Sequence, residues 1–233
     1  MSGPGYYGAL MPRTILVTEG SSPLGAALVR RFAERGYSVA AACERGEESP
    51  SHAVEGLPVG ERCLSLVWNR RSAASARTVL LSVVNAFGTL DEVVILEPAA
   101  AGGALTSVTT ADVDRAFDDA KGPVLLVREV LASFLGRGSG TLGFASGGPA
   151  SGPVEAAARD AFRGLATALM GAPGASGIIV NGFQAGPGTA EDYAAFIDRT
   201  LEEKARKISG RWFSPPGRGG GFLQGVFKTP SSP

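Results

Sequence analysis

Short apolar runs alternate along this chain with longer amphipathic segments. Seven runs have the length and apolar character of buried β-strands, namely Thr14–Thr18, Ser38–Cys43, Cys63–Trp68, Glu92–Leu96, Gly140–Ala145, Ile178–Phe183 and Arg211–Ser214. The segments between them repeat their apolar residues with helical spacing and predict five helices, at Leu24–Arg35, Ala73–Phe87, Thr110–Leu135, Val154–Met170 and Ala190–Ile208. Strands that are apolar continuously rather than alternately are typical of a parallel sheet covered on both faces. The pattern therefore predicts an α/β fold, with a doubly wound parallel sheet of about seven strands in a three-layer αβα sandwich.

The length and composition of the chain favour a single globular domain. Its 233 residues are enough for one α/β domain with a full core, and 44% of them are hydrophobic while 19% are charged. We expect this domain to span residues 12–215. Residues 1–11 predict a flexible N-terminal extension, and residues 216–233, which are rich in Gly and Pro, predict a tail outside the domain.

Charge and cysteine content argue against several classes of function. The 22 basic and 22 acidic residues balance, so no overall field attracts nucleic acid, and the densest basic pair, Arg70-Arg71, is interpreted as part of a solvated loop. No apolar run approaches the ~20 residues that span a membrane, and the N-terminus lacks the pattern of a secretory signal. We therefore expect a cytoplasmic protein. Cys43 and Cys63 are predicted to be reduced, buried thiols, and His52 is the single histidine, so we expect no metal site.

The segment between the first strand and the first helix has the layout of a dinucleotide-binding turn. It reads Thr18-Glu19-Gly20-Ser21-Ser22-Pro23-Leu24-Gly25. In such turns glycines let the backbone approach a pyrophosphate, and helix N–H groups point at it. Glu19 places a carboxylate near those phosphates, and a like charge at ~4 Å costs about 1 kcal/mol in water and about 4 kcal/mol at an effective dielectric of 20. Pro23 removes an N–H but suits the first helical position, which Ser21 or Ser22 can cap.

The order and spacing of these segments resemble the short-chain dehydrogenase/reductase family over residues 12–215, and this resemblance implies a Rossmann-like form of the predicted fold. In the turn, Thr18 and Gly25 match the family pattern TGxxxGxG, while Glu19 and Pro23 replace its first two glycines. Four further segments match in part, namely EPAA (Glu97–Ala100) at NNAG, FDDAKGPVLLVREVL (Phe117–Leu131) at the FxxNxKG helix, VNGFQAGPGT (Val180–Thr189) beside the nicotinamide, and ISGRWFS (Ile208–Ser214) at the closing strand.

The resemblance implies which residues would hold a nicotinamide dinucleotide. These positions are Thr18, Gly20, Ser22, Leu24 and Gly25 in the turn, Ala99 after the fourth strand, and Gly186 and Thr189 after the sixth. At the adenosine end, Glu44 would bind a ribose hydroxyl and Arg45 would pair with a 2′-phosphate, although we favour a solvated loop for this charged run. Because two glycines are replaced, we expect no cofactor to be bound tightly and any binding of NAD(P) to be weak.

The same resemblance places the family's catalytic Ser, Tyr and Lys at Ser146, Glu155 and Arg159. Hydride transfer in this family uses a Tyr whose pKa is lowered by a Lys one helical turn away. Here Glu155 and Arg159 form a Glu-to-Arg pair at i,i+4, which stabilises a helix by roughly 0.2–0.5 kcal/mol. Tyr193 is the one tyrosine that could reach the cleft in which the family binds its substrate. We interpret it instead as a surface-packing residue. We expect these positions to be inactive in the family's usual reaction.

Three functions stay open at this stage. The first is a pseudoenzyme of the reductase family that acts as a scaffold or partner subunit. The alternative is an NAD(P)H-dependent oxidoreductase with a non-standard acid, Glu155 together with Ser146. The more remote alternative is an anion-binding protein similar to the halohydrin dehalogenases, which share this fold, bind halide and carry an Arg at the position of Arg159.

The helix predicted at Val154–Met170 is a candidate contact for a partner chain. It carries small residues on one face, at Ala157, Ala161, Gly164 and Ala168. In the resembling family this helix takes part in the four-helix contact of a dimer, which implies a homodimer, a homotetramer or a heteromer with an active relative. Core packing within one chain is the other explanation of the small face.

Overall fold

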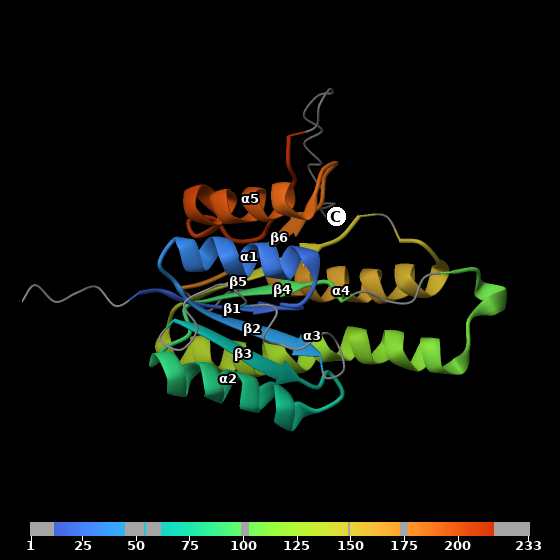
Figure 1. Cartoon of the computed structure of the whole chain (residues 1–233), viewed down its shortest axis with the longest axis horizontal. Helices are drawn as coiled ribbons and strands as arrows, with labels where there is room; N and C mark the ends of the chain where they lie inside the picture. Colours follow the sequence, from blue (N-terminus) through green and yellow to red (C-terminus); the bar gives the residue numbers. More distant parts are fainter. Residues whose placement is uncertain are drawn as a thin grey trace, which may run out of the picture.

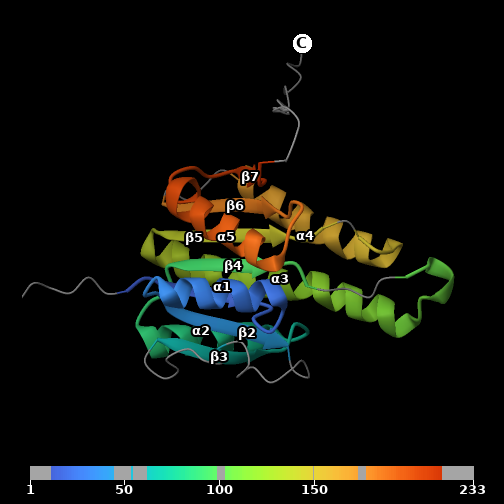
Figure 2. The ribbon, with the colours of Figure 1, turned by 45° about the horizontal axis from the view of Figure 1, so that its top comes forward.

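A single sheet of seven strands organises the molecule, in the order β3-β2-β1-β4-β5-β6-β7. The computed structural model describes residues 12–44, 54, 62–98, 103–148, 150–172 and 177–216. The strands are β1 (Thr14–Thr18), β2 (Ser38–Glu44), β3 (Cys63–Trp68), β4 (Glu92–Leu96), β5 (Gly140–Ser146), β6 (Ile178–Gln184) and β7 (Arg211–Phe213). All six neighbouring pairs are parallel. Figure 2 shows the sheet running from β3 at the bottom to β7 at the top.

Helices cover both faces of this sheet. The elements are α1 (Pro23–Glu34), α2 (Ala73–Phe87), α3 (Thr110–Arg137), α4 (Pro153–Gly171) and α5 (Ala190–Thr200), with a short 3-10 turn η2 (Leu105–Ser107) and a π-helical turn η3 (Leu201–Ala205). Helices α1 and α5 lie on one face, and α2, α3 and α4 lie on the other (Figure 1). The predicted α/β fold, its parallel sheet and its three layers are thus confirmed.

Differences from the predicted elements are confined to their ends, apart from the last helix. The predicted helix at Ala190–Ile208 is α-helical as far as Thr200 and then widens into η3. Leu201 and Ala205 remain buried in this wider turn, so the apolar spacing that suggested a longer helix is still used for packing. The 3-10 turn η2 was not predicted, because three residues carry no detectable periodicity.

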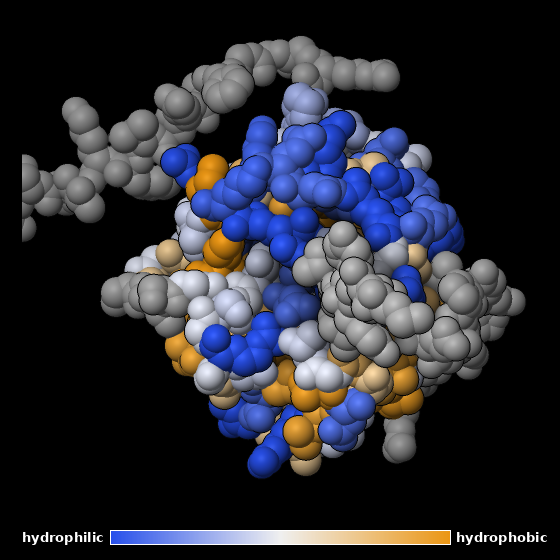
Figure 3. Space-filling model, turned by 90° about the vertical axis from the view of Figure 1, so that its left-hand side faces the viewer, coloured by the Kyte–Doolittle hydropathy of each residue, from blue (hydrophilic) through white to orange (hydrophobic). Residues whose placement is uncertain are grey.

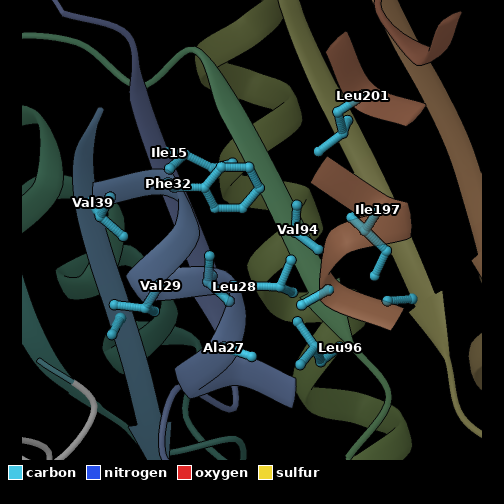
Figure 4. Close-up of a cluster of buried hydrophobic side chains, with 14 of the residues drawn as sticks. Ile15, Ala27, Leu28, Val29, Phe32, Val39, Val94, Leu96, Ile197 and Leu201 are labelled. Atoms are coloured by element: carbon cyan, nitrogen blue, oxygen red, sulfur yellow. The ribbon is translucent and has the colours of Figure 1, made fainter. Parts of the chain in front are cut away.

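Two cores hold the layers together, one on each face of the sheet. On the first face, Leu28 and Phe32 of α1 and Ile197 of α5 meet Ile15 and Val94 of the sheet, all of them at most 1% exposed (Figure 4). Full burial of such a side chain contributes about 1.5–3 kcal/mol. Packing on both faces is why the strands are continuously apolar.

Several sequence predictions fall outside the described residues. These are the N-terminal extension 1–11, His52, the cofactor candidates Arg45 and Ala99, and the tail except for residue 216. Cys43 and Cys63 are both buried, as predicted. Among the helices of the described part, none has both the length and the apolar character needed to cross a membrane.

Candidate functional site

The turn between β1 and α1 is built to start a helix. Ser22 is the N-cap, and its hydroxyl accepts from the N–H of Gly25 at 3.0 Å. Pro23 occupies the first helical position and has no N–H, while Ala26 donates to the Ser22 carbonyl at 2.8 Å. Within the first helical turn, the N–H of Leu24 is therefore what remains for a ligand, whereas an uncapped helix start offers several such groups.

Both remaining glycines of the turn are required by close packing. A Cβ at Gly25 would lie 2.0 Å from the carbonyl oxygen of Glu19, and one at Gly20 would lie 2.8 Å from the Cβ of Ala41. Either contact would force the backbone to shift, because no side-chain rotation relieves it. These glycines are thus explained by the fold without reference to a phosphate.

Glu19 does not face an open phosphate site. Its φ is +52°, a left-handed conformation that favours glycine, so the backbone keeps a glycine-like shape at this position. The residue is 4% exposed, and its carboxylate is paired with the guanidinium of Arg70. The sequence places the Glu19 carboxylate beside the turn but does not indicate its partner, and Arg70 supplies a counter-charge that lowers the expected like-charge cost.

Arg70 is the centre of a buried group of charges, which we call the Arg70 cluster. Besides Glu19, it binds the carboxylates of Glu44 at 2.7 Å and of Asp119 at 2.6 Å. Its guanidinium carbon also lies 6.0 Å from the centre of the Trp68 ring. Arg70 is 2% exposed, so the interpretation of this residue as part of a solvated loop is wrong, and Glu44 is likewise tied into the cluster.

Burial and ion pairing act in opposite directions on the charged groups of the Arg70 cluster. Burial lowers the pKa of Arg70, but the carboxylates of Glu19, Asp119 and Glu44 outweigh it and raise that pKa above its ordinary value. Burial raises the pKa of Asp119, and the charge and hydrogen bond of Arg70 oppose it only in part. Arg70 is therefore a fixed cation, and burial favours the protonated form of Asp119.

A second group of charges lies at the positions matched to the family's catalytic residues, and we call it the Arg159 network. Ser146 ends β5 and donates its hydroxyl to Glu97 at 2.7 Å, and Glu97 also accepts from the N–H of Gly147 at 3.0 Å. Arg159 of α4 pairs with Glu97 through Nε and with Glu155 at 2.8 Å. The structure thus brings the predicted residues Ser146, Glu155 and Arg159 together, but through Glu97.

The acid of this network is held as an anion. Burial raises the pKa of Glu155, but hydrogen bonds from the side chain and backbone of Ser151, together with the charge of Arg159, outweigh burial and lower that pKa below its ordinary value. A carboxyl with a lowered pKa is ionised near neutral pH and has no proton to donate. The predicted i,i+4 pair is therefore present, as one part of a larger network.

Tyr193 lies beneath this network and does not join it. The hydroxyl group lies 2.7 Å from the carbonyl oxygen of Phe183 and 3.0 Å from that of Ser146. Tyr193 is 7% exposed, so its interpretation as a surface residue is wrong. Burial, assisted by the negative charge of Glu97, raises the pKa of Tyr193 far above its ordinary value. The hydroxyl proton of Tyr193 is therefore donated to backbone carbonyl groups near the ends of β5 and β6.

The other cofactor candidates lie along the same edge of the sheet and serve as local structural elements. The hydroxyl of Thr18 accepts from the N–H of Leu96 at 2.9 Å and so joins the ends of β1 and β4. Thr189 caps α5 reciprocally with Asp192. A Cβ at Gly186 would lie 3.0 Å from Pro215. Carboxyl ends of strands are where ligands bind in doubly wound sheets, so the predicted residues share the expected location.

Sequence reasoning missed three residues that organise this edge, namely Glu97, Arg70 and Asp119. Glu97 directly follows β4, and Arg70 comes two residues after β3 ends. Their position at strand ends was a usable signal, because charged residues there converge on one edge. Asp119 lies within α3 and carried no such signal. In the described part of the chain, no group of three or more His, Cys, Asp and Glu residues is arranged to hold a metal ion.

The small-residue face of α4 is exposed. Ala157, Ala161, Gly164 and Ala168 are all exposed, and α4 buries Phe162 and Ala166 instead. Core packing within one chain is therefore the wrong explanation of this face. Helices α3 and α4 lie side by side and project beyond the carboxyl edge of the sheet (Figures 1 and 2). Between them lies an apolar pocket of about 270 Å³, beside which Phe117 is 72% exposed.

Comparison with known proteins agrees with this fold. Residues 13–196 match the family model described as short chain dehydrogenase. Among curated proteins, none matches the sequence.

Three solved structures illustrate the similarity. Each match covers 87% of this chain and at least 94% of the other chain. A short chain dehydrogenase from Bacillus anthracis str. 'Ames Ancestor' is 18% identical with a TM-score of 0.75. A variant of actinorhodin polyketide ketoreductase solved with NADPH is 17% identical with a TM-score of 0.76. Levodione reductase is 21% identical with a TM-score of 0.74. At these identities the similarity describes the fold.

Proposed function

Because the chain belongs to the short-chain dehydrogenase family, we propose that it is a member without reductase activity, a pseudoenzyme that acts as a subunit of an oligomer. The observation that carries this proposal is the Arg159 network. At the positions matched to the family's Ser, Tyr and Lys, it has Ser146, Glu155 and Arg159, whose polar groups are engaged with Glu97 and with one another.

Carbonyl reduction needs a group that gives a proton as hydride arrives. Glu155 is ionised because its pKa is lowered, and Arg159 stays protonated at any physiological pH. The Ser146 hydroxyl donates its proton to Glu97 and is 1% exposed. None of these three groups is suited to protonate an alkoxide in the cleft, which supports the loss of the family's reaction.

The geometry of the turn supports weak cofactor binding. A pyrophosphate would find the N–H of Leu24 in the first helical turn, beside a Glu19 that is already paired with Arg70. The dianion gains little from so few donors, and diverting Arg70 towards it would strip buried carboxylates of their counter-ion. Binding of NAD(P) is therefore proposed to be weak, in contrast to the ketoreductase that was solved with NADPH.

Titration with NADH and with NADPH by calorimetry tests the loss of cofactor binding. We expect no saturable binding tighter than about 1 mM, which corresponds to about −4 kcal/mol. An active short-chain reductase titrated in the same buffer is the positive control, and circular dichroism establishes that this protein is folded. Submillimolar binding together with turnover of a carbonyl substrate would overturn the proposal.

The other two candidate functions predict different results. An oxidoreductase that uses Glu155 with Ser146 as its acid would lose turnover in Glu155→Ala and Ser146→Ala, but the lowered pKa of Glu155 weighs against it. An anion site at Arg159 would bind chloride or bromide, but Glu97 and Glu155 already occupy that guanidinium. A halide titration followed by calorimetry separates this case from the others.

We further propose that the exposed face of α4 forms the subunit contact, in a homodimer, a homotetramer or a heteromer with an active relative. The exposed small residues allow another helix to approach closely, and the apolar pocket between α3 and α4 supplies area to bury. Sedimentation of the wild type at micromolar concentration should give a mass above that of one chain. Ala161→Glu should reduce this mass, while Ala74→Glu, at an exposed position of α2, should leave it unchanged. The proposal is contradicted if the wild type sediments as a monomer and also does not bind an active relative.

A further inference from the structure

A polar hollow of about 470 Å³ lies at the amino edge of the sheet, opposite the edge that carries the Arg70 cluster and the Arg159 network. It is lined by residues at the starts of β1, β4, β5 and β6, by the end of α3 and by Arg206 after η3. Figure 3 looks onto this edge, where hydrophilic residues gather over the upper half and the centre. The volume is within the roughly 300–1,000 Å³ usual for small-molecule sites.

Two arginines of the hollow are held rigidly. Arg137 donates to the Leu90 carbonyl at 2.5 Å and to Asp91 at 3.1 Å, and its guanidinium lies 6.0 Å from the centre of the Phe134 ring. Arg206 makes a two-point contact with Glu92, at 2.8 Å and 3.1 Å. Such fixed guanidinium groups lose little side-chain entropy when they bind an anion.

The two acids of the hollow are already saturated with donors. Asp91 accepts from Arg137 through Oδ1 and from the N–H of Thr14 through Oδ2 at 2.9 Å. Glu92 accepts from Arg13 and Arg206 and is 2% exposed. Neither carboxylate has an oxygen left unpaired for a cation, so the hollow does not suit a metal ion.

Unused donors face the same space. The Arg13 side chain is 56% exposed and makes one contact in the described part of the chain, from Nη1 to Glu92 at 2.8 Å. Its Nε and Nη2 therefore remain available. Ser139 and Thr141 also line the hollow, and neither hydroxyl is hydrogen-bonded to another group within the described part of the chain. Among the described lining residues, three guanidinium groups against two carboxylates leave a formal charge of +1.

We propose that this hollow binds a small oxyanion of the phosphate type, either free or as the phosphoryl group of a metabolite. Arg13 contacts the anion directly, the hydroxyls of Ser139 and Thr141 donate to its oxygens, and the net charge of +1 of the described lining favours the anion. Charge-assisted bonds from Arg to such oxygens are short, directional and about twice as strong as neutral ones. The site lies at the opposite edge from the cofactor turn, so it is independent of the function proposed above.

The test is a calorimetric titration of the full chain with inorganic phosphate and, separately, with glycerol phosphate, at constant ionic strength in sodium chloride. We expect saturable binding of at least one of the two. Free phosphate alone identifies an inorganic ion as the occupant, and tighter binding of glycerol phosphate identifies a phosphorylated metabolite. Arg13→Gln should weaken binding at least tenfold, and Thr141→Val should weaken it several-fold.

Two control variants keep the result specific. Arg30→Gln removes a comparably exposed arginine, 54% exposed, from another part of the surface and should leave binding unchanged. Ser22→Ala disturbs the start of α1, the other place where a phosphate could bind, and should also leave binding unchanged. Arg13→Gln is expected to fold, because Glu92 keeps its contact with Arg206. No saturable heat with either anion, equal affinity in Arg13→Gln, or loss in Ser22→Ala would overturn the proposal.

Discussion

The Arg70 cluster and the Arg159 network each surround one arginine, yet they differ in burial and in balance. The side chain of Arg70 is 3% exposed and binds three carboxylates, two of which are also nearly inaccessible. Arg159 is 11% exposed, binds two carboxylates and shares one of them with the hydroxyl of Ser146. A charge left unpaired in the Arg70 cluster has almost no access to water. In the Arg159 network Glu97 is nearly as buried, at 8% exposed, but Glu155 is 17% exposed and keeps more of its hydration.

This difference separates a structural role from a role at the site. The Arg70 cluster joins the ends of β1 and β2, the segment after β3 and helix α3, so it links four parts of the fold. The Arg159 network joins α4 to the ends of β4 and β5, at the positions matched to the family's catalytic residues. We therefore expect substitutions in the cluster to act mainly on stability, and those in the network to act less on stability and more on which groups are available for a ligand.

Arg70→Met should have the largest effect. It leaves the buried carboxylates of Glu19 and Asp119 without their cation, and breaking a buried ion pair in this way lowers the free energy of unfolding by about 3–5 kcal/mol. Urea unfolding followed by circular dichroism measures the loss. The neighbouring Arg71→Met, whose side chain is 64% exposed, is the control and should change stability by less than about 0.5 kcal/mol.

Arg159→Met should have a smaller effect of the same sign. Glu97 keeps the hydrogen bonds from Ser146 and Gly147 after the substitution, so we expect a loss of about 1–3 kcal/mol in the same unfolding experiment. Arg128→Met, at an exposed position of α3, is the control. A loss as large as that of Arg70→Met would erase the distinction between the cluster and the network.

Asp119→Asn tests the cluster through the pH dependence of stability. Burial raises the pKa of Asp119, so the folded protein keeps this proton at pH values where the unfolded chain, with an ordinary pKa of about 3.9, has lost it. The free energy of unfolding of the wild type, relative to the variant, should therefore fall as the pH rises from about 4 through the raised pKa. Thermal unfolding of both proteins at several pH values measures this. A constant difference would contradict the assignment.

Glu155→Gln should give the smallest effect, with the opposite dependence on pH. The pKa of Glu155 is lowered by Ser151 and Arg159 against the effect of burial, so its contribution is present above the ordinary pKa of about 4.3. That contribution is lost as the pH falls through the lowered value. At neutral pH we expect the variant to lose no more than about 1 kcal/mol, because Gln can still accept hydrogen bonds and Arg159 keeps its pair with Glu97. A relative gain of the wild type on acidification would be the wrong sign.

The fold could be read from the sequence because its signals are local. Continuous apolar runs such as Glu92–Leu96 predicted buried parallel strands, and Ser22 with Pro23 predicted the start of α1. The end of the last helix could not be predicted, since a π-helical turn keeps buried positions such as Leu201 and Ala205 and so leaves the apolar pattern unbroken.

The location of the candidate site and its i,i+4 pair were predictable from the sequence, but its contacts between distant residues were not. Ser146, Glu155 and Arg159 were placed together by their matched positions, yet Glu97, which joins them, is 49 residues from Ser146. Arg70 looked like a loop residue because its partners Glu19 and Asp119 are 51 and 49 residues away. Pairings over such distances depend on how strands and helices cross, and no local pattern encodes which carboxylate an arginine will meet.

The Arg70 cluster also constrains how this chain can change over generations. Glu19 can be exchanged for glycine first, since Arg70 then still has Glu44 and Asp119. Exchange of Arg70 first is expected to cost more stability, because Glu19 and Asp119 would be left buried without their cation, and coupled residues of this kind do not contribute additively. The same set of substitutions therefore passes through a less stable intermediate in one order than in the other. The order of substitution therefore matters for this cluster, and we expect the acids to tolerate exchange before the arginine does.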